Sequence, residues 1–147
     1  MASRFFFGVL ALACAVAFAG CGGKSDEEKA KEAAAAASAP VCVMTKTVSG
    51  SKLPSGFPKP TAVTYHEEKT TGPSEVVNGT YEGDLDAAYD AYQQAVKAAH
   101  YDVLFNEKEE DDAEISYEGG GTTGQIALRA VCGDGDKLVV HITNRPK

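Results

Sequence analysis

Hydrophobic positions recur with a helical period in the segment from Asp84 to His100. Apolar side chains stand three or four residues apart, at Leu85, Ala88, Tyr89, Tyr92, Val96 and Ala99. This spacing places them on one stripe of a helix, and Asp84 is a suitable N-cap residue. We therefore predict an amphipathic helix over 84–100, with the hydroxyls of Tyr89 and Tyr92 at the rim of the core.

The pattern changes to strict alternation after this helix, which indicates strands. Four runs each place apolar residues on one face: Tyr101, Val103 and Phe105; Ile115 and Tyr117; Ile126, Leu128 and Ala130; Leu138, Val140 and Ile142. The connections are polar or rich in glycine. Upstream, the segments 41–48, 61–67 and 75–81 also have strand character, and a turn over 68–73 separates the last two.

Short connections between consecutive strands are typical of antiparallel hairpins. The sequence thus predicts a two-layer α+β domain over 41–147, in which one amphipathic helix packs on one face of an antiparallel sheet of about five to seven strands. The segment from Leu53 to Pro60 contains three prolines and is unsuited to a helix or a central strand. We expect Leu53 and Phe57 to hold it against the domain.

The first residues have the plan of an export signal. Arg4 precedes an apolar run from Phe5 to Phe18, and the end of the run overlaps the sequence Phe18-Ala19-Gly20-Cys21. As a helix this run would span only about 21 Å, which is short of the hydrocarbon core of a membrane, about 30 Å. The last four residues resemble the lipobox of bacterial lipoprotein precursors. Alternatively, Ala-Phe-Ala before Gly20 fits ordinary signal-peptide cleavage, which would leave Cys21 unmodified.

The resemblance implies a signal peptide over 1–20 and a mature chain that begins at Cys21, whose sulfur carries a diacylglycerol with acyl chains such as palmitate. The segment 21–40 has no large apolar residue, so we interpret it as a tether of alanine and charged residues. The expected location is the extracytoplasmic side of the cell membrane or outer membrane. The membrane would then be a partner through the N-terminal lipid anchor.

Charge narrows the range of partners. The formal net charge of −7 becomes −8 once residues 1–20 are removed, because that segment contains Arg4 and no acidic residue. An acidic domain repels phosphate backbones and anionic head groups, which argues against nucleic acid as a partner.

The resemblance also bears on the cysteines. Cys14 would leave with the signal peptide and Cys21 would be acylated, so Cys42 and Cys132 remain. In an oxidising compartment we expect these two to form a disulfide. A redox-active or metal-binding pair is disfavoured, because the two lie far apart, lack a CxxC arrangement and have no neighbouring histidine.

No motif for catalysis is present. His66, His100 and His141 are scattered without zinc spacing, and no serine stands in a GxSxG setting. The acidic residues of the segment 107–118 lack EF-hand spacing and are interpreted as a solvated hairpin, although a cation site is the alternative. We therefore expect no catalytic residue, metal or cofactor, and a non-catalytic envelope-maintenance or binding module for a protein or cell-wall partner. A solute- or cation-binding lipoprotein and a small hydrolase using His66 or His141 are the alternatives.

Overall fold

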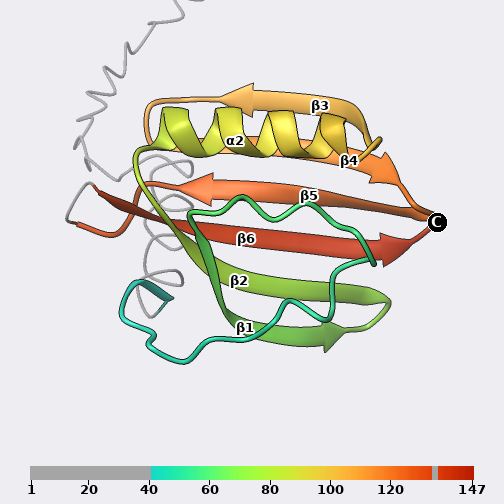
Figure 1. The fold of residues 1–147 in the computed structure, drawn as a ribbon, viewed down its shortest axis with the longest axis horizontal. Helices are drawn as coiled ribbons and strands as arrows, with labels where there is room; N and C mark the ends of the chain where they lie inside the picture. The colour runs from blue at the N-terminus through green and yellow to red at the C-terminus, as the bar shows by residue number, and fades with distance from the viewer. Residues whose placement is uncertain (1–40, 134–135) are drawn as a thin grey trace, which may run out of the picture.

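A computed structural model describes residues 41–133 and 136–147. Within them, one helix packs on a six-stranded antiparallel sheet (Figure 1). The elements are β1 (Val63–Thr71), β2 (Ser74–Glu82), α2 (Leu85–Ala98), β3 (Asp102–Lys108), β4 (Asp112–Gly119), β5 (Thr122–Arg129) and β6 (Lys137–Pro146). The predicted α+β class and two-layer arrangement are confirmed. The signal peptide, Cys21 and the tether lie outside the described residues.

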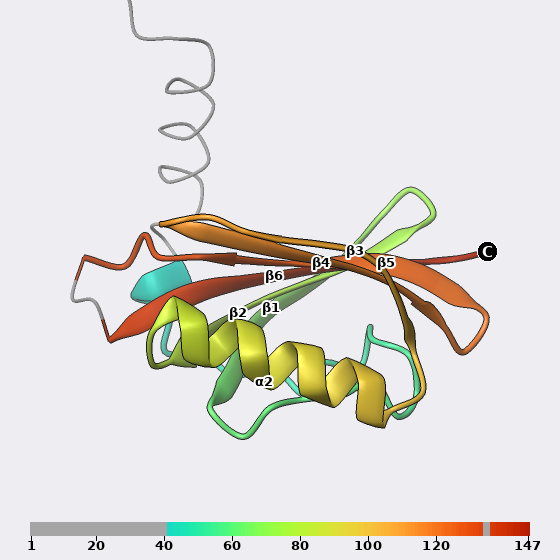
Figure 2. The ribbon, with the colours of Figure 1, turned by 90° about the horizontal axis from the view of Figure 1, so that it is seen from above.

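The strands follow the order β1-β2-β6-β5-β4-β3. Strands β3 to β6 form a continuous meander, and the β1–β2 hairpin joins it where β2 pairs with β6. Helix α2 begins after β2, and β3, at the far edge of the sheet, follows it. The chain therefore crosses one face of the sheet on its way from β2 to β3, and α2 lies on that face, as Figure 2 shows with the sheet seen edge-on.

The predicted helix is confirmed, and so is its cap. The Oδ1 atom of Asp84 accepts a hydrogen bond of 2.7 Å from the backbone N–H of Ala87, which satisfies one of the free donors of the first turn. One prediction about its surface is wrong. Tyr92 is fully buried and its hydroxyl lies inside the core, because the layer opposite α2 also carries large aromatic residues, including Tyr65 and Tyr117.

A single helix cannot cover this sheet. Six strands spaced by about 4.8 Å span roughly 24 Å, whereas a helix with its side chains is about 10 Å wide. Helix α2 contacts β3, β4 and β5, and the proline-containing segment from Leu53 to Pro60 lies on the same face (Figures 1 and 2). As predicted, Leu53 and Phe57 pack against the core. The ring of Phe57 lies 5.2 Å from that of Tyr117.

The first predicted strand, over 41–48, is wrong. Val41 and Cys42 are helical and the following residues form no strand. Instead, the backbone N–H of Val48 donates to the carbonyl of Tyr65 in β1, and the side chains of Ser51 and Lys52 bond to Glu68 and Thr70. The segment therefore shields the outer edge of β1, which would otherwise expose unpaired backbone groups.

Two strand predictions also need correction. Strand β1 begins two residues later than predicted, but β1 and β2 both extend further toward the turn and are joined by Gly72 and Pro73 alone. Gly72 has a positive φ of 59°. In β3, the register shifts between Val103 and Phe105. This bulge turns Phe105 to the opposite face from Val103, because it interrupts the alternation of the strand. The prediction that both side chains share one face is therefore wrong.

Candidate functional site

The sheet has one covered face and one face that no described segment covers over most of β4, β5 and β6. We call the face opposite α2 the open face. Core residues such as Ile126, Leu128, Val140 and Ile142 point toward α2. The residues between them point the other way, because side chains alternate along a strand.

Strand pairing aligns the side chains of the open face into rows across the sheet. One row contains Phe105, Ser116, Gln125 and Thr143, contributed by β3, β4, β5 and β6 in that order. We call these four residues the polar row. Directly opposite side chains have Cβ atoms about 5 Å apart, so the row is a continuous strip of one aromatic ring, two hydroxyls and one carboxamide.

A depression of about 390 Å³ lies on this part of the sheet. Its polar side chains are hydroxyl, carboxamide and guanidinium groups, contributed by Ser74, Ser116, Thr123, Gln125, Thr143 and Arg145. No carboxylate lines it, although the domain as a whole is acidic. The depression is therefore suited to a polar ligand, and its cation is suited to a negatively charged group.

The row next to the polar row holds a chain of hydrogen bonds between three strands. The Nδ2 atom of Asn78 donates to Oε2 of Glu67 over 2.7 Å. The Oδ1 atom of Asn78 lies 2.6 Å from Nδ1 of His141. Since Asn78 uses its amino group for Glu67, its oxygen accepts the Nδ1–H of His141. Nε2 of the neutral ring then carries the lone pair.

Burial lowers the pKa of His141, and the positive charges of Arg129 and Lys69 lower it further, whereas Glu67 acts in the opposite direction. The imidazole is thus held neutral and oriented. A hydrolase would also need a nucleophile bonded to this base. Within the described residues, no hydroxyl or thiol forms a hydrogen bond with His141, so the structure offers no nucleophile–base pair there.

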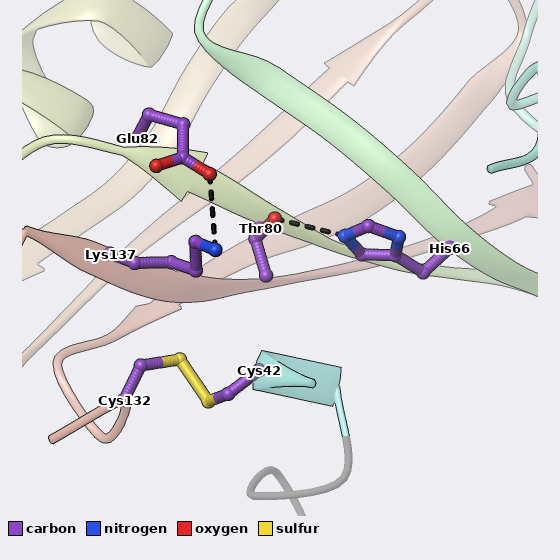
Figure 3. Close-up of a disulfide and its surroundings, with 6 residues drawn as sticks. All are labelled: Cys42, His66, Thr80, Glu82, Cys132 and Lys137. Carbon is purple, nitrogen blue, oxygen red and sulfur yellow. Dashed lines mark hydrogen bonds and ion pairs between the residues drawn. A yellow bond between two sulfur atoms is a disulfide. The ribbon is translucent and has the colours of Figure 1, made fainter. Parts of the chain in front are cut away.

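The other histidines have different surroundings. His66 is buried, with Nδ1 2.8 Å from the carbonyl oxygen of Lys46 and Nε2 2.9 Å from Oγ1 of Thr80. Figure 3 shows the second of these contacts. Because a carbonyl can only accept, Nδ1 donates and Nε2 accepts the hydroxyl hydrogen. His66 therefore links the segment before β1 to the sheet, and the three histidines do not form one site.

The predicted disulfide between Cys42 and Cys132 is present, with Cα atoms 5.6 Å apart (Figure 3). Val41 packs with Cys132 and Val139. The side chain of Val139 lies on the open face, because its neighbours Leu138 and Val140 point into the core. The bridge therefore fastens the start of the described domain to the connection between β5 and β6.

A second, larger depression of about 570 Å³ lies beside the start of α2 and the end of β5. Three of its four charged residues, all except Glu110, already have partners. Asp84 caps the helix, Asp86 pairs with Lys108, and Lys137 pairs with Glu82 over 3.3 Å. We therefore take the open face as the candidate binding surface.

The acidic residues of the β3–β4 hairpin are not gathered into a metal site. Across residues 41–133 and 136–147, no group of three or more histidine, cysteine or acidic side chains is arranged to hold a metal ion. Glu107 and Glu114 face each other on neighbouring strands, where such like charges repel each other.

Sequence reasoning did not identify the polar row or Arg145. In the sequence, these residues are the polar positions that alternate with the core residues of each predicted strand. To know which of them become neighbours, the pairing register of the strands is required. In the described part of the chain no helix is long and apolar enough to cross a membrane. Comparison of the chain with protein-family models, curated proteins and solved structures found no match.

Proposed function

We propose that this chain is a bacterial lipoprotein whose folded part is a non-catalytic binding domain of the cell envelope. A lipid on Cys21 holds it on the extracytoplasmic side of the cell membrane or outer membrane, and the open face contacts a partner there. The resemblance of Phe18-Ala19-Gly20-Cys21 to a lipobox supports the anchor. The disulfide between Cys42 and Cys132 suits an oxidising compartment.

The observation that carries the binding role is the contrast between the two faces of the sheet. Helix α2 and the segment before β1 bury one face against a core of apolar and aromatic residues. The other face carries ordered polar groups, such as the hydrogen-bonded Glu67, Asn78 and His141, beside a depression that contains Arg145. A sheet covered on one side only is a rigid platform on which side chains are held in register for a ligand.

The anchor is tested by the intact mass of the mature protein extracted from membranes. We expect the mass of residues 21–147 plus acyl groups, and a gain of two hydrogens on reduction of the disulfide. The variant Cys21→Ser is the matched control, because it removes the acylated sulfur and should release the chain from the membrane. An unacylated wild-type chain would contradict the anchor.

The binding face is tested by a photo-crosslinking amino acid placed at single sites in living cells. Gln125 lies in the polar row, and Gln94 is an exposed residue of α2 on the opposite side of the domain. We expect a crosslinked adduct from position 125 and none from position 94. Equal labelling at both positions, or no adduct at position 125, would contradict a binding role for the open face.

A further inference from the structure

We infer that the polar row and Arg145 bind a short oligosaccharide that carries a carboxylate. This inference rests on the proposed function, because it names the ligand class of the open face. It combines three features of neighbouring strands: an exposed aromatic ring, a strip of neutral hydrogen-bonding groups, and a guanidinium.

The aromatic ring belongs to Phe105. Its side chain is 53 % exposed, although it lies on the same face as Ser116 and directly opposite it. The face of an aromatic ring carries partial negative charge and attracts the polarised C–H groups on the flat side of a sugar ring. Phe105 therefore provides a stacking platform at the end of the polar row.

The neutral groups have unused hydrogen-bonding capacity. In the described part of the chain, the hydroxyls of Ser116 and Thr143 form no hydrogen bond. Gln125 donates to Glu114 over 2.7 Å through Nε2, which leaves its carbonyl oxygen available. Hydroxyls that both donate and accept, beside a carboxamide acceptor, suit the hydroxyls and amide substituents of sugars. The row crosses four strands and is about 14 Å long, which is sufficient for a short oligosaccharide.

The positive charge that would bind the carboxylate of the ligand belongs to Arg145, near the end of β6. This side chain is exposed and lines the depression, and no carboxylate of the described residues forms an ion pair with it. A guanidinium binds a carboxylate through two parallel hydrogen bonds. The net charge of the domain repels anions in general, so selection of an acidic ligand depends on this residue.

A peptide strand added to the sheet edge fits the geometry less well. The outer edge of β1 is shielded by the segment before it. The other edge strand, β3, is interrupted by the bulge between Val103 and Phe105, which disrupts the regular pairing that an added strand requires.

The test uses the detergent-solubilised full chain and titration calorimetry. The probes are tetrasaccharides of two kinds, N-acetylhexosamine chains with lactyl ether carboxylates and uronic acid chains, each also as the methyl ester. We expect at least one carboxylated probe to bind about tenfold more tightly than its ester. Arg145→Gln should abolish this difference, and Phe105→Ala should weaken binding of both forms.

Matched controls are Val43→Ala, which truncates another exposed apolar residue, and Lys97→Gln, which removes an exposed cation on α2. Both should bind as the wild type does. The inference is overturned if no probe binds, or if binding does not depend on Phe105 and Arg145. If position 125 forms an adduct but no probe binds, only the oligosaccharide inference is contradicted and the proposed binding role of the open face is retained. If there is neither an adduct nor probe binding, both the binding role and the inference are contradicted.

Discussion

Nδ1 of His141 lies 2.6 Å from Oδ1 of Asn78 on the neighbouring strand, and this contact fixes the orientation of the imidazole on the open face. Behind Asn78, Glu67 completes the chain of hydrogen bonds. The ring is thus part of an ordered polar network within a rigid sheet, and its protonation is coupled to folding.

The free energy of unfolding should decrease as the pH is lowered, because of His141. Burial, Arg129 and Lys69 lower its pKa in the folded protein, whereas the unfolded chain has a pKa of about 6.5. As the pH falls below about 6.5, the unfolded state takes up the proton first, so the free energy of unfolding decreases. Above that pH the contribution is complete.

Urea denaturation at pH 8 and pH 5 would measure this effect. The variant His141→Gln should lose less stability between the two values than the wild type does, since it cannot take up the proton. Gln94→Ala, on the exposed side of α2, should retain the wild-type difference. Equal losses for His141→Gln and the wild type would show that this imidazole is not coupled to folding.

Removal of the disulfide should destabilise the domain strongly. Cys42 and Cys132 are 90 residues apart in the sequence. Constraint of a loop of this length in the unfolded state contributes about 4 to 5 kcal/mol. We expect Cys42→Ser with Cys132→Ser to lower the free energy of unfolding by about this amount in urea titrations. An unchanged transition would show that the unfolded chain gains little freedom when the bridge is absent.

Replacement of Tyr92 by Phe should be tolerated or stabilising. The hydroxyls of Tyr65 and Tyr92 are buried, and neither has a hydrogen-bond partner of normal geometry. They are neighbours, and the proximity of Tyr65 contributes to the raised pKa of Tyr92, whose main cause is burial. Burial raises the pKa of Tyr65 to about 12. Loss of an unpaired buried hydroxyl removes a desolvation cost of about 1 kcal/mol or more.

Tyr117→Phe is the matched comparison for Tyr92→Phe, because the hydroxyl of Tyr117 donates to the carbonyl of Thr143 over 3.2 Å. Its loss should cost about 1 kcal/mol. The melting temperature should therefore fall for Tyr117→Phe and stay the same or rise for Tyr92→Phe. A larger loss for Tyr92→Phe would indicate that its hydroxyl has a partner in solution.

Gly124 should not tolerate alanine. A Cβ atom at this position would meet the carbonyl oxygen of Thr143 and lie 2.5 Å from the hydroxyl oxygen of Tyr117. Both are held within the sheet, so we expect a loss of about 1 to 3 kcal/mol, typical of overpacking. Gly133→Ala is the control, since a Cβ there has no atom within 4 Å. Thermal unfolding of both variants would measure the difference, and equal stabilities would show that the sheet can relax around Gly124.

The candidate site was only partly predictable, as two residues illustrate. His141 drew attention as a titratable residue, but its partners Asn78 and Glu67 are far away in the sequence and became neighbours only through strand pairing. Phe105 was expected on the core side. The bulge in β3 places its side chain on the open face instead, and no residue type in that strand predicts a bulge.

Local periodicity by itself determined the helix, the four strands after it and the antiparallel α+β class, because spacing of apolar residues decides which face of each element is buried. The disulfide between Cys42 and Cys132 was predicted from the resemblance to lipoprotein precursors, which assigned other roles to Cys14 and Cys21. Only the tertiary structure decided that β2 pairs with β6, that the proline-containing segment shares the covered face with α2, and that Phe105 stands opposite Ser116, which lines the same depression as Arg145. These relationships depend on contacts between residues distant in sequence, and the period of a single segment carries no information about its partner.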